Sequence, residues 1–239
     1  MAPWLNKLLF ILVIFITNIV QAITSFAGTA LAMPFSIQLV GVGVARPILN
    51  AIALILCIYL AIRYHKDVSW KLVLFITIFA GIGMAVGMVT RSYLYNSMFY
   101  KFYGMFVCLL ATLFIIKPQT KPLPTWALAI ILIAGGFIHG VFVSGGPLIV
   151  FALNTKVKEK EKFRATLSFV WVILNAVLLT QDLVQMSWSM DMLYLLLIAI
   201  PTVALSIFLG KKVFNKLNNE SFLKFAYILL FVSGFILLC

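Results

Sequence analysis

The sequence consists of long apolar runs separated by short polar segments. Most of these runs are long enough to approach the 30 Å hydrocarbon core of a bilayer, which a helix of about 20 residues crosses. Two shorter apolar pieces, 29–42 and 147–153, follow the first and fifth runs. The pattern predicts an all-α polytopic membrane protein with about eight hydrophobic segments. The runs cover residues 5–23, 48–62, 72–89, 99–116, 126–143, 167–180, 192–209 and 222–238.

Composition supports this prediction and argues against a soluble protein and a nucleic-acid-binding protein. Hydrophobic residues make up 64% of the chain and charged residues 10%, which leaves too few polar groups to cover a soluble domain. The net charge of +12 is typical of nucleic-acid binding, but the basic residues lie in short loops, where they fix topology. Cys57, Cys108 and Cys239 lie in or at the ends of apolar runs without paired spacing, which indicates neither a disulfide nor a metal site. With Lys7 at the start of its first apolar run, the N-terminus resembles a signal peptide, but a partner run later in the chain argues against cleavage.

A repeated motif divides the chain into two halves. The segment "QAITSFAG" (21–28) aligns with "HGVFVSGG" (139–146) at an offset of 118, and the same offset places Arg46 on Arg164. Later in each half, "NSMFYKF" (96–102) aligns with "NESFLKF" (219–225) at an offset of 123. Such ordered self-similarity indicates a duplication. We predict a first membrane repeat over 1–116, a connector over 117–124 and a second membrane repeat over 125–239.

The distribution of basic residues favours inverted repeats, because Lys and Arg prefer the cytoplasmic side. If every long run crosses once, the halves are parallel, and the better orientation leaves these residues outside: Arg63, Lys66, Lys71, Lys117 and Lys121. If the first and fifth runs instead enter, break and return, the halves are inverted. Only Arg46, Arg91 and Lys101 then join Lys7 outside. We therefore predict that a broken or re-entrant helix starts each repeat.

The break in the fifth run has the residues of a new helix start. Pro147 suits the first turn of a helix, Ser144 is placed to cap that turn, and Gly145 and Gly146 permit positive φ angles and close approach of a ligand. In the first half, Ser25 and Thr29 supply hydroxyls and Gly28 the flexible joint. Backbone groups freed by a break are tolerated in a membrane only inside the protein or at a cavity.

Two helix N-termini that meet inside a membrane form a site for an anion. The alternative is that the glycines only permit close helix packing. We favour the binding site at the two breaks and the packing role for five other glycines: Gly81, Gly83, Gly87, Gly135 and Gly136.

The titratable residues argue against cation transport and catalysis. All six acidic residues are assigned to loops: Asp67, Glu159, Glu161, Asp182, Asp191 and Glu220. A cation transporter usually holds a carboxylate in the membrane, and no paired acid, base or nucleophile suggests an enzyme. His139 is the only intramembrane group that titrates near neutral pH; substrate binding, proton relay and a structural hydrogen bond all remain open for it. Arg46 and Arg164 are expected at opposite membrane edges, where they either attract anions or extend to the interface as ordinary basic residues do.

The segments "VQAITSFAGTALAMPF" and "IHGVFVSGGPLIVFAL" resemble the duplicated signature of the TauE/SafE family of sulfite and organosulfonate permeases, over essentially the whole chain. The second motif is the more specific, and the first has Ala27 where a second glycine is commoner. The resemblance implies a secondary transporter for small sulfur-containing anions in the bacterial inner membrane, without a cofactor.

We therefore expect a multi-pass permease that alternates access around the two breaks, with lipid and a small anion as partners, no nucleic acid, and a homo-oligomer left open. The alternative is a non-transporting membrane scaffold or assembly factor. The anion, its direction of transport and any ion coupling are not predicted. The residues expected to bind substrate are Gln21, Ser25, Gly28, Thr29, Asn50, His139, Ser144, Gly145, Gly146 and Pro147, with Arg46 and Arg164 as gating or anion-attracting residues.

Overall fold

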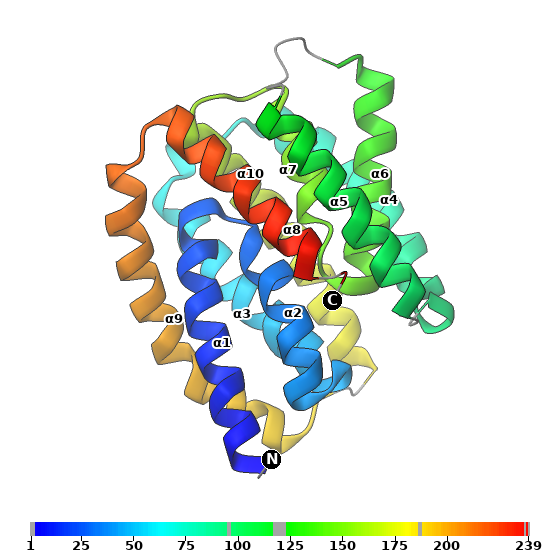
Figure 1. Ribbon diagram of the computed structural model, residues 1–239, viewed down its shortest axis with the longest axis vertical. Coiled ribbons are helices and arrows are strands. Elements are labelled where there is room, and N and C mark those ends of the chain that lie inside the picture. Colours follow the sequence, from blue (N-terminus) through cyan, green and yellow to red (C-terminus); the bar gives the residue numbers. More distant parts are fainter. Residues whose placement is uncertain (1–2, 95–96, 117–122, 186–187, 237, 239) are drawn as a thin grey trace.

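The protein is a bundle of long helices (Figure 1), with a break between α1 and α2 and another between α6 and α7. The computed structural model describes residues 3–94, 97–116, 123–185, 188–236 and 238. Within these residues it contains no strand. The helices are α1 (Pro3–Thr24), α2 (Ala27–Val40), α3 (Val42–Arg63), the 3-10 turn η1 (His65–Asp67), α4 (Trp70–Leu94), α5 (Ser97–Ile116), α6 (Thr125–Phe142), α7 (Gly146–Asn154), α8 (Lys160–Val184), α9 (Met190–Lys216) and α10 (Asn219–Ile236).

The predicted apolar runs fall on these helices, which confirms an all-α polytopic membrane protein. In the part of the chain that the structure describes, seven helices are long and apolar enough to cross a membrane: α1, α3, α4, α6, α8, α9 and α10. The exposed positions of α4 include Leu74, Ile78 and Ile82, each at least half exposed. Their spacing of four residues forms one apolar stripe, which is the surface expected to face lipid.

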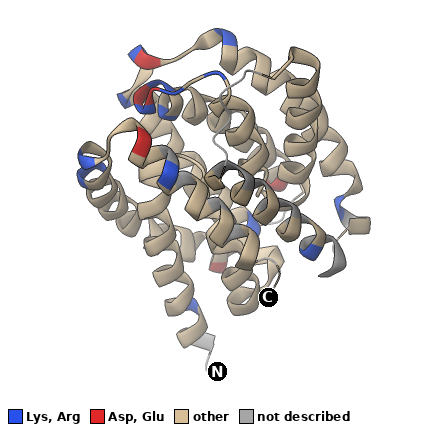
Figure 2. Ribbon diagram, turned by 45° about the horizontal axis from the view of Figure 1, so that its top comes forward, with Lys and Arg blue, Asp and Glu red and all other residues tan. Residues whose placement is uncertain are grey.

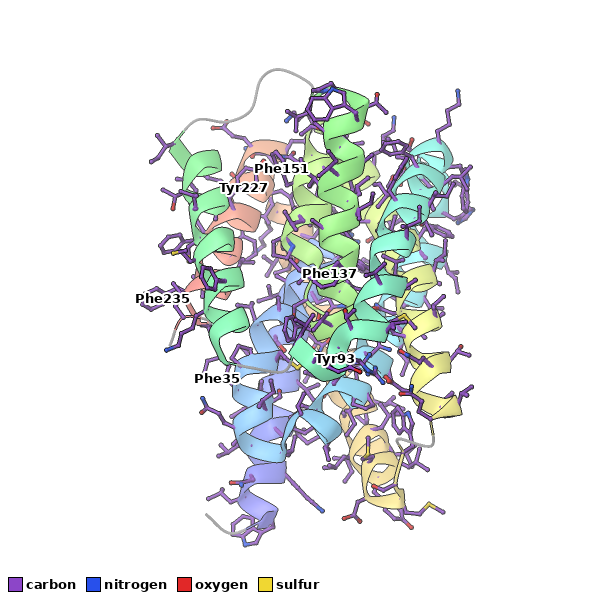
Figure 3. All side chains as sticks on the ribbon, turned by 90° about the vertical axis from the view of Figure 1, so that its right-hand side faces the viewer. Phe35, Tyr93, Phe137, Phe151, Tyr227 and Phe235 are labelled. Carbon is purple, nitrogen blue, oxygen red and sulfur yellow. The ribbon has the colours of Figure 1, made fainter. Side chains whose placement is uncertain are left out.

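Each predicted break is the tip of a helical hairpin. Helix α2 returns along α1, so that a Cβ atom on Gly28 would come within 3.0 Å of the backbone oxygen of Thr17. Helix α7 likewise returns along α6, and a Cβ on Gly135 would lie 3.0 Å from Leu148. In Figure 3, Phe151 of α7 lies nearer the upper end of the bundle than Phe137 of α6, although it comes later in the chain. The predicted enter, break and return path is confirmed.

The two hairpins enter the bundle from opposite ends. At one end, the start of α1 meets the start of α9, where Lys7 and Asp191 lie 3.4 Å apart, and Val40 at the end of α2 lines the same groove. At the other end, Lys71 of α4, Thr125 of α6 and Lys156 after α7 line a second groove. Each hairpin therefore begins and finishes at its own end of the bundle.

The packing of the helices follows an approximate two-fold relation between the halves. Helix α1 packs on α9 as α6 packs on α4, and α2 packs on α1 as α7 packs on α6. Two further pairs join equivalent helices directly, α3 with α8 and α5 with α10. Helices α3 and α8 are antiparallel, because Arg46 near the start of α3 contacts Asp182 near the end of α8. The inverted relation is confirmed, whereas the repeat boundaries stay a prediction and residues 117–122 of the connector lie outside the described residues.

Basic residues identify the two ends of the bundle. Figure 2 shows most Lys and Arg residues in loops and at helix ends. The end where α4, α6 and α8 begin carries Arg63, Lys66, Lys71, Lys156, Lys158, Lys160 and Lys162. The other end carries Lys7, Arg46, Arg91 and Lys101. By the positive-inside rule, we call the first the cytoplasmic end and the second the outer end. Lys117 and Lys121, also predicted to be cytoplasmic, lie outside the described residues.

Glycines allow α4 and α6 to pack with their backbones in contact. A Cβ on Gly83 would lie 2.7 Å from the carbonyl carbon of Ile133, and one on Gly87 would lie 3.1 Å from that of Phe137. Gly136 of α6 lies equally close to the backbone of Ala80. The packing role predicted for these glycines is confirmed, as it is for Gly135 against α7. It is wrong for Gly81, where an added Cβ would meet nothing within 4 Å.

Candidate functional site

The tip of the first hairpin is held by Thr24. Its hydroxyl accepts hydrogen bonds from the backbone N–H groups of Phe26 and Ala27, each at 3.4 Å. Ser25 turns the chain with a φ of 66°, a left-handed conformation that is uncommon for a residue with a side chain. The N-cap residue of α2 is Phe26, whose side chain makes no capping hydrogen bond. Phe26 and Ala27 are both buried, so the N-terminal end of α2 lies inside the protein.

The second tip repeats this geometry with different residues. Val143, which lies at the position equivalent to Ser25, turns the chain with a φ of 55°. Gly145 is the N-cap residue of α7, and Pro147 lies in the first turn as predicted. The prediction that Ser144 caps α7 is wrong, because its hydroxyl donates to the carbonyl oxygen of Phe142 at 3.1 Å. The expected positive φ at the glycines is also wrong: Gly145 has a φ of −69°, and its lack of a side chain instead admits His139, whose Cβ would lie 2.7 Å from an added Cβ.

The two tips meet each other within the protein. A Cβ on Gly146 would lie 3.5 Å from both the ring and the backbone oxygen of Phe26, so the start of α7 rests on the start of α2. The hydroxyl of Ser25 lies 3.1 Å from that of Ser168 on α8. All four residues are buried. The freed backbone groups therefore face protein, as the absence of water in a bilayer requires.

A small cavity separates the tips, and its wall comes from both halves. Its volume is about 10 Å³, which is room for about one water molecule. Of the predicted site residues, Gln21, Ser25, Thr29, His139 and Gly146 line this cavity. Five further residues complete the wall and were not predicted to bind substrate: Phe26, Ala53, Val143, Trp171 and Asn175.

Polar side chains around the cavity are paired in equivalent ways in the two halves. Gln21 of α1 donates to the sulfur of Cys57 on α3 at 3.7 Å. At the equivalent positions, the Nε2 atom of His139 lies 3.0 Å from the Oδ1 atom of Asn175. The His139 ring also lies beside Trp171, with 4.9 Å between the ring centroids. With Nε2 donating to Asn175, Nδ1 of a neutral ring is an acceptor, and it donates to a ligand only when the ring is protonated.

Buried polar atoms at the cavity retain hydrogen-bonding capacity. Among the residues that the structure describes, the Nδ1 atom of His139 and the indole Nε1 of Trp171 have no hydrogen-bond partner. Both side chains are nine-tenths or more buried. A buried polar group without a partner costs about 1–3 kcal/mol. These atoms are therefore placed to gain stabilisation from a polar ligand.

The other predicted binding residues support the tips without lining the cavity. Gly28 packs inside the first hairpin against Gln21, and Gly145 packs inside the second against His139. Asn50 of α3 donates to the backbone oxygen of Asn175 at 3.2 Å, and its own Oδ1 atom has no partner among the described residues. Ser144 and Pro147 belong to the turn itself. The structure thus brings half of the predicted set to the cavity and the other half directly behind it.

Arg46 and Arg164 lie near the starts of α3 and α8 and are buried in the protein, so their side chains do not extend to the interface as those of ordinary basic residues do. Arg46 is 5% exposed and Arg164 is 1% exposed. Arg164 lies against the rings of Tyr64 and Phe214, at 4.1 Å and 3.6 Å from their centroids, and donates to the backbone oxygen of Ala22 at 3.2 Å. Such cation–π contacts are strongest where water is excluded. This cluster ties α8 to the end of α1 and is called here the cytoplasmic clamp.

The prediction that every acidic residue lies in a loop is wrong. Glu161, Asp191 and Glu220 lie in the first turns of α8, α9 and α10, and the largest departure is Asp182. This residue belongs to α8 and is 1% exposed. It forms an ion pair with Arg46, and its Oδ1 atom lies 3.6 Å from Arg91 of α4. Arg91 also contacts the side chains of Gln181 and Gln185. We call this cluster the outer clamp. At the offset of the repeat, Asp182 corresponds to Tyr64, so the two clamps occupy equivalent places and differ in chemistry.

The comparison with protein families decides the identification. The model of the family described as "Sulfite exporter TauE/SafE" matches residues 10–237. The chain belongs to the TauE/SafE family. This TauE/SafE protein is therefore a multi-pass membrane protein of a transporter family, with a small anion and membrane lipid as its expected partners. No curated protein and no solved structure gives a significant match.

Proposed function

We propose that this TauE/SafE protein carries sulfite or a related small sulfur-containing anion across the bacterial inner membrane. The observation that supports this most is the meeting of two hairpin tips around a buried polar cavity. The N-terminal ends of α2 and α7 supply partial positive charge there. Gln21, Ser25 and Thr29 add uncharged polar groups, and none of the described residues that line the cavity has a carboxylate that would repel an anion.

The proposed substrate is held by neutral donors rather than by a fixed cation. We assign direct contacts to Ser25, Thr29 and the backbone around Gly146, with Trp171 donating through its indole N–H. Asn50, Gly28, Ser144, Gly145 and Pro147 hold the tips in place. Dipoles in a water-poor site bind an anion without the desolvation cost of a buried ion pair. Such a site also releases the anion more readily than a site that contains a free guanidinium.

The cavity must widen for transport. Sulfite has four non-hydrogen atoms, whereas the cavity has room for about one water molecule. Both clamps are also closed, and each joins elements of the two halves. We propose that the outer and cytoplasmic clamps open in turn, which exposes the tips to one side at a time. In this proposal the arginines act as gates and also draw anions toward the tips.

The scaffold alternative receives no support from the outer surface. The scaffold hypothesis requires polar faces on the outside of the bundle to bind a partner. The most exposed large side chains of α9 include Leu197, Ile198 and Phe208, and those of α4 form the apolar stripe described above. These surfaces suit lipid. We therefore retain transport as the proposed function and expect no catalysis.

Removal of one hydroxyl from the cavity tests the binding site. Thr29→Val keeps the shape of the side chain and removes one polar contact, so we expect the half-saturation concentration for sulfite to rise about tenfold, from the loss of a hydrogen bond to a charged group. Uptake into proteoliposomes measures this change. Gly146→Leu fills the space beside Phe26 and is expected to abolish uptake.

Two control variants make this test specific. Thr180→Val removes a hydroxyl that donates to the backbone oxygen of Ala176 within α8, and Thr90→Val removes one that donates to the backbone oxygen of Val86 within α4. Both are expected to transport sulfite within about twofold of the parent, because neither hydroxyl lines the cavity. Parental kinetics in a folded Gly146→Leu protein would show that the substrate does not pass between the tips.

Reversible cross-linking of the outer clamp tests alternating access. In a background without native cysteines, Arg46→Cys and Asp182→Cys remove both charges of this buried pair together. Arg91 loses its carboxylate partner but keeps its contacts with Gln181 and Gln185. A short bis-methanethiosulfonate cross-linker joins the two thiols through disulfide bonds and is expected to reduce transport to below about a tenth, since rocking requires this contact to open. A thiol reductant cleaves these disulfide bonds and is expected to restore transport. The single-cysteine variants treated in the same way are the controls. Unchanged transport in the fully cross-linked protein would contradict a moving outer gate.

A further inference from the structure

A groove at the cytoplasmic end has a composition distinct from that of the substrate cavity. It has a volume of about 260 Å³ and lies where α4, α6 and α7 meet. Its interior is apolar and includes Phe75, Leu128 and Leu132, the last two almost fully buried. Lys71 and Lys156 stand at its mouth, and both are exposed. An apolar interior below a pair of lysines has the amphipathic character of a membrane lipid.

The lysines at this mouth have no built-in counter-charge. Within the residues that the structure describes, neither Lys71 nor Lys156 forms an ion pair, and the lining of the groove contains no acidic residue. The groove therefore combines unneutralised positive charge with apolar surface. Basic pockets between transmembrane helices on the cytoplasmic side bind the headgroups of anionic lipids.

The equivalent groove at the outer end provides an internal comparison. It has a similar volume, about 280 Å³, and lies where α1, α2, α3 and α9 meet. Its single lysine, Lys7, lies 3.4 Å from Asp191, so the charge at its mouth is neutralised. The two halves thus present similar grooves, of which the cytoplasmic one carries net positive charge.

We propose that the cytoplasmic groove binds one anionic phospholipid. The lipid phosphate lies between Lys71 and Lys156, and one acyl chain lies against the partly exposed side chains of Leu72 and Phe75. The other chain remains in the bilayer. Because Lys71 begins α4 and Lys156 follows α7, the bound lipid connects the base of the α6–α7 hairpin to α4. A lipid bound in the groove stabilises the hairpin in the arrangement seen here. This effect does not depend on which anion the protein transports.

Lipid selectivity of the purified full-length protein tests this proposal. We expect dioleoylphosphatidylglycerol to bind at least about tenfold more tightly than dioleoylphosphatidylcholine, since each lysine near an anionic lipid contributes roughly a few-fold in affinity. Native mass spectrometry counts the bound lipids, and thermal unfolding at rising lipid concentration measures the stabilisation. Glycerol phosphate, which has the headgroup chemistry without acyl chains, is expected to give no stabilisation.

Charge variants assign the selectivity to this groove. Lys71→Gln combined with Lys156→Gln is expected to reduce the preference for phosphatidylglycerol to within about twofold, whereas Lys7→Gln is expected to leave it unchanged. The substituted side chains are exposed, so these variants are expected to fold. Retention of the full preference by the double variant would overturn the proposal. Equal stabilisation by both lipids, or equal stabilisation by glycerol phosphate, would overturn it too.

Discussion

Asp182→Asn is expected to destabilise the protein more than the loss of any other single charge. The substitution keeps the size of the side chain but leaves Arg46 and Arg91 beside each other without a negative partner, and Arg46 is 5% exposed. Removing one partner of a buried ion pair typically costs about 3–5 kcal/mol. For a chain of this length, we expect the thermal midpoint in detergent to fall by about 10 °C.

The outer groove offers a matched control for this prediction. Asp191→Asn removes the same group from the Lys7 pair, in which both side chains are substantially exposed, and such pairs contribute about 0–1 kcal/mol. Its midpoint is expected to stay close to that of the parent. Adding Arg46→Met to Asp182→Asn removes one of the unpaired cations and is expected to restore part of the loss. A midpoint for Asp182→Asn within 1–2 °C of the parent, roughly the effect of a surface change, would refute the structural role of this carboxylate.

Gly83→Ala is expected to destabilise the protein strongly, although it adds only a single methyl group. The new Cβ would lie 2.7 Å from the carbonyl carbon of Ile133 and 2.9 Å from the backbone nitrogen of Phe137. Backbone atoms cannot move aside as a flexible side chain does, so α4 must separate from α6. Forcing an extra carbon into a packed interface costs about 1–3 kcal/mol or more. The thermal midpoint and the monodispersity of the purified protein report the effect.

Gly81→Ala, two residues earlier in the same helix, is the control for that variant. An added Cβ at Gly81 meets nothing within 4 Å, and alanine is favoured over glycine in a helix by about 1 kcal/mol. The two substitutions are therefore expected to shift the midpoint in opposite directions. An equal fall of the thermal midpoint in Gly83→Ala and Gly81→Ala would mean that the α4–α6 contact does not cause the destabilisation.

The fold was predictable because the lengths of the apolar runs, the repeated motif and the placement of basic residues are each strong signals in the sequence. In a bilayer, apolar run length nearly determines where helices lie, and the repeated motif identified the equivalent helices. The glycine and proline residues at 144–147 then located a break, and the placement of basic residues selected the inverted arrangement. Each of these signals can be read from a short segment or from a sum over residues. None of them depends on which side chains contact each other in the folded protein.

The details of the breaks were less predictable because they depend on tertiary packing. Glycine was the expected residue for the left-handed turn, yet Ser25 and Val143 adopt it. The neighbouring glycines are instead required where the hairpin arms touch, as at Gly145 beside His139. Backbone conformation that disfavours a β-branched residue is retained only where surrounding structure enforces it, and sequence spacing carries no record of that enforcement.

The charged residues show the limit of a hydropathy criterion. A window that seeks apolar residues ends α8 at residue 180, before Asp182, and therefore places this carboxylate in a loop. Two observations identify Asp182 as part of a buried ion pair. It corresponds to Tyr64 at the repeat offset, and it faces Arg46. Trp171 and Asn175 were missed as cavity residues for a related reason: they lie on α8, away from either break motif, and reach the cavity only because α8 packs beside the tips.

The substitution of Asp182 for the equivalent Tyr64 has a kinetic consequence. If the arginines draw anions as proposed, an anion that arrives from outside competes with the Asp182 carboxylate for Arg46. One that arrives from the cytoplasm meets Arg164, which is held by two π faces and one carbonyl oxygen. Unequal half-saturation concentrations are therefore expected on the two faces of the membrane, with the lower value inside. The gradient still sets the net direction of flux, but under this proposal the two ports have different thresholds for loading.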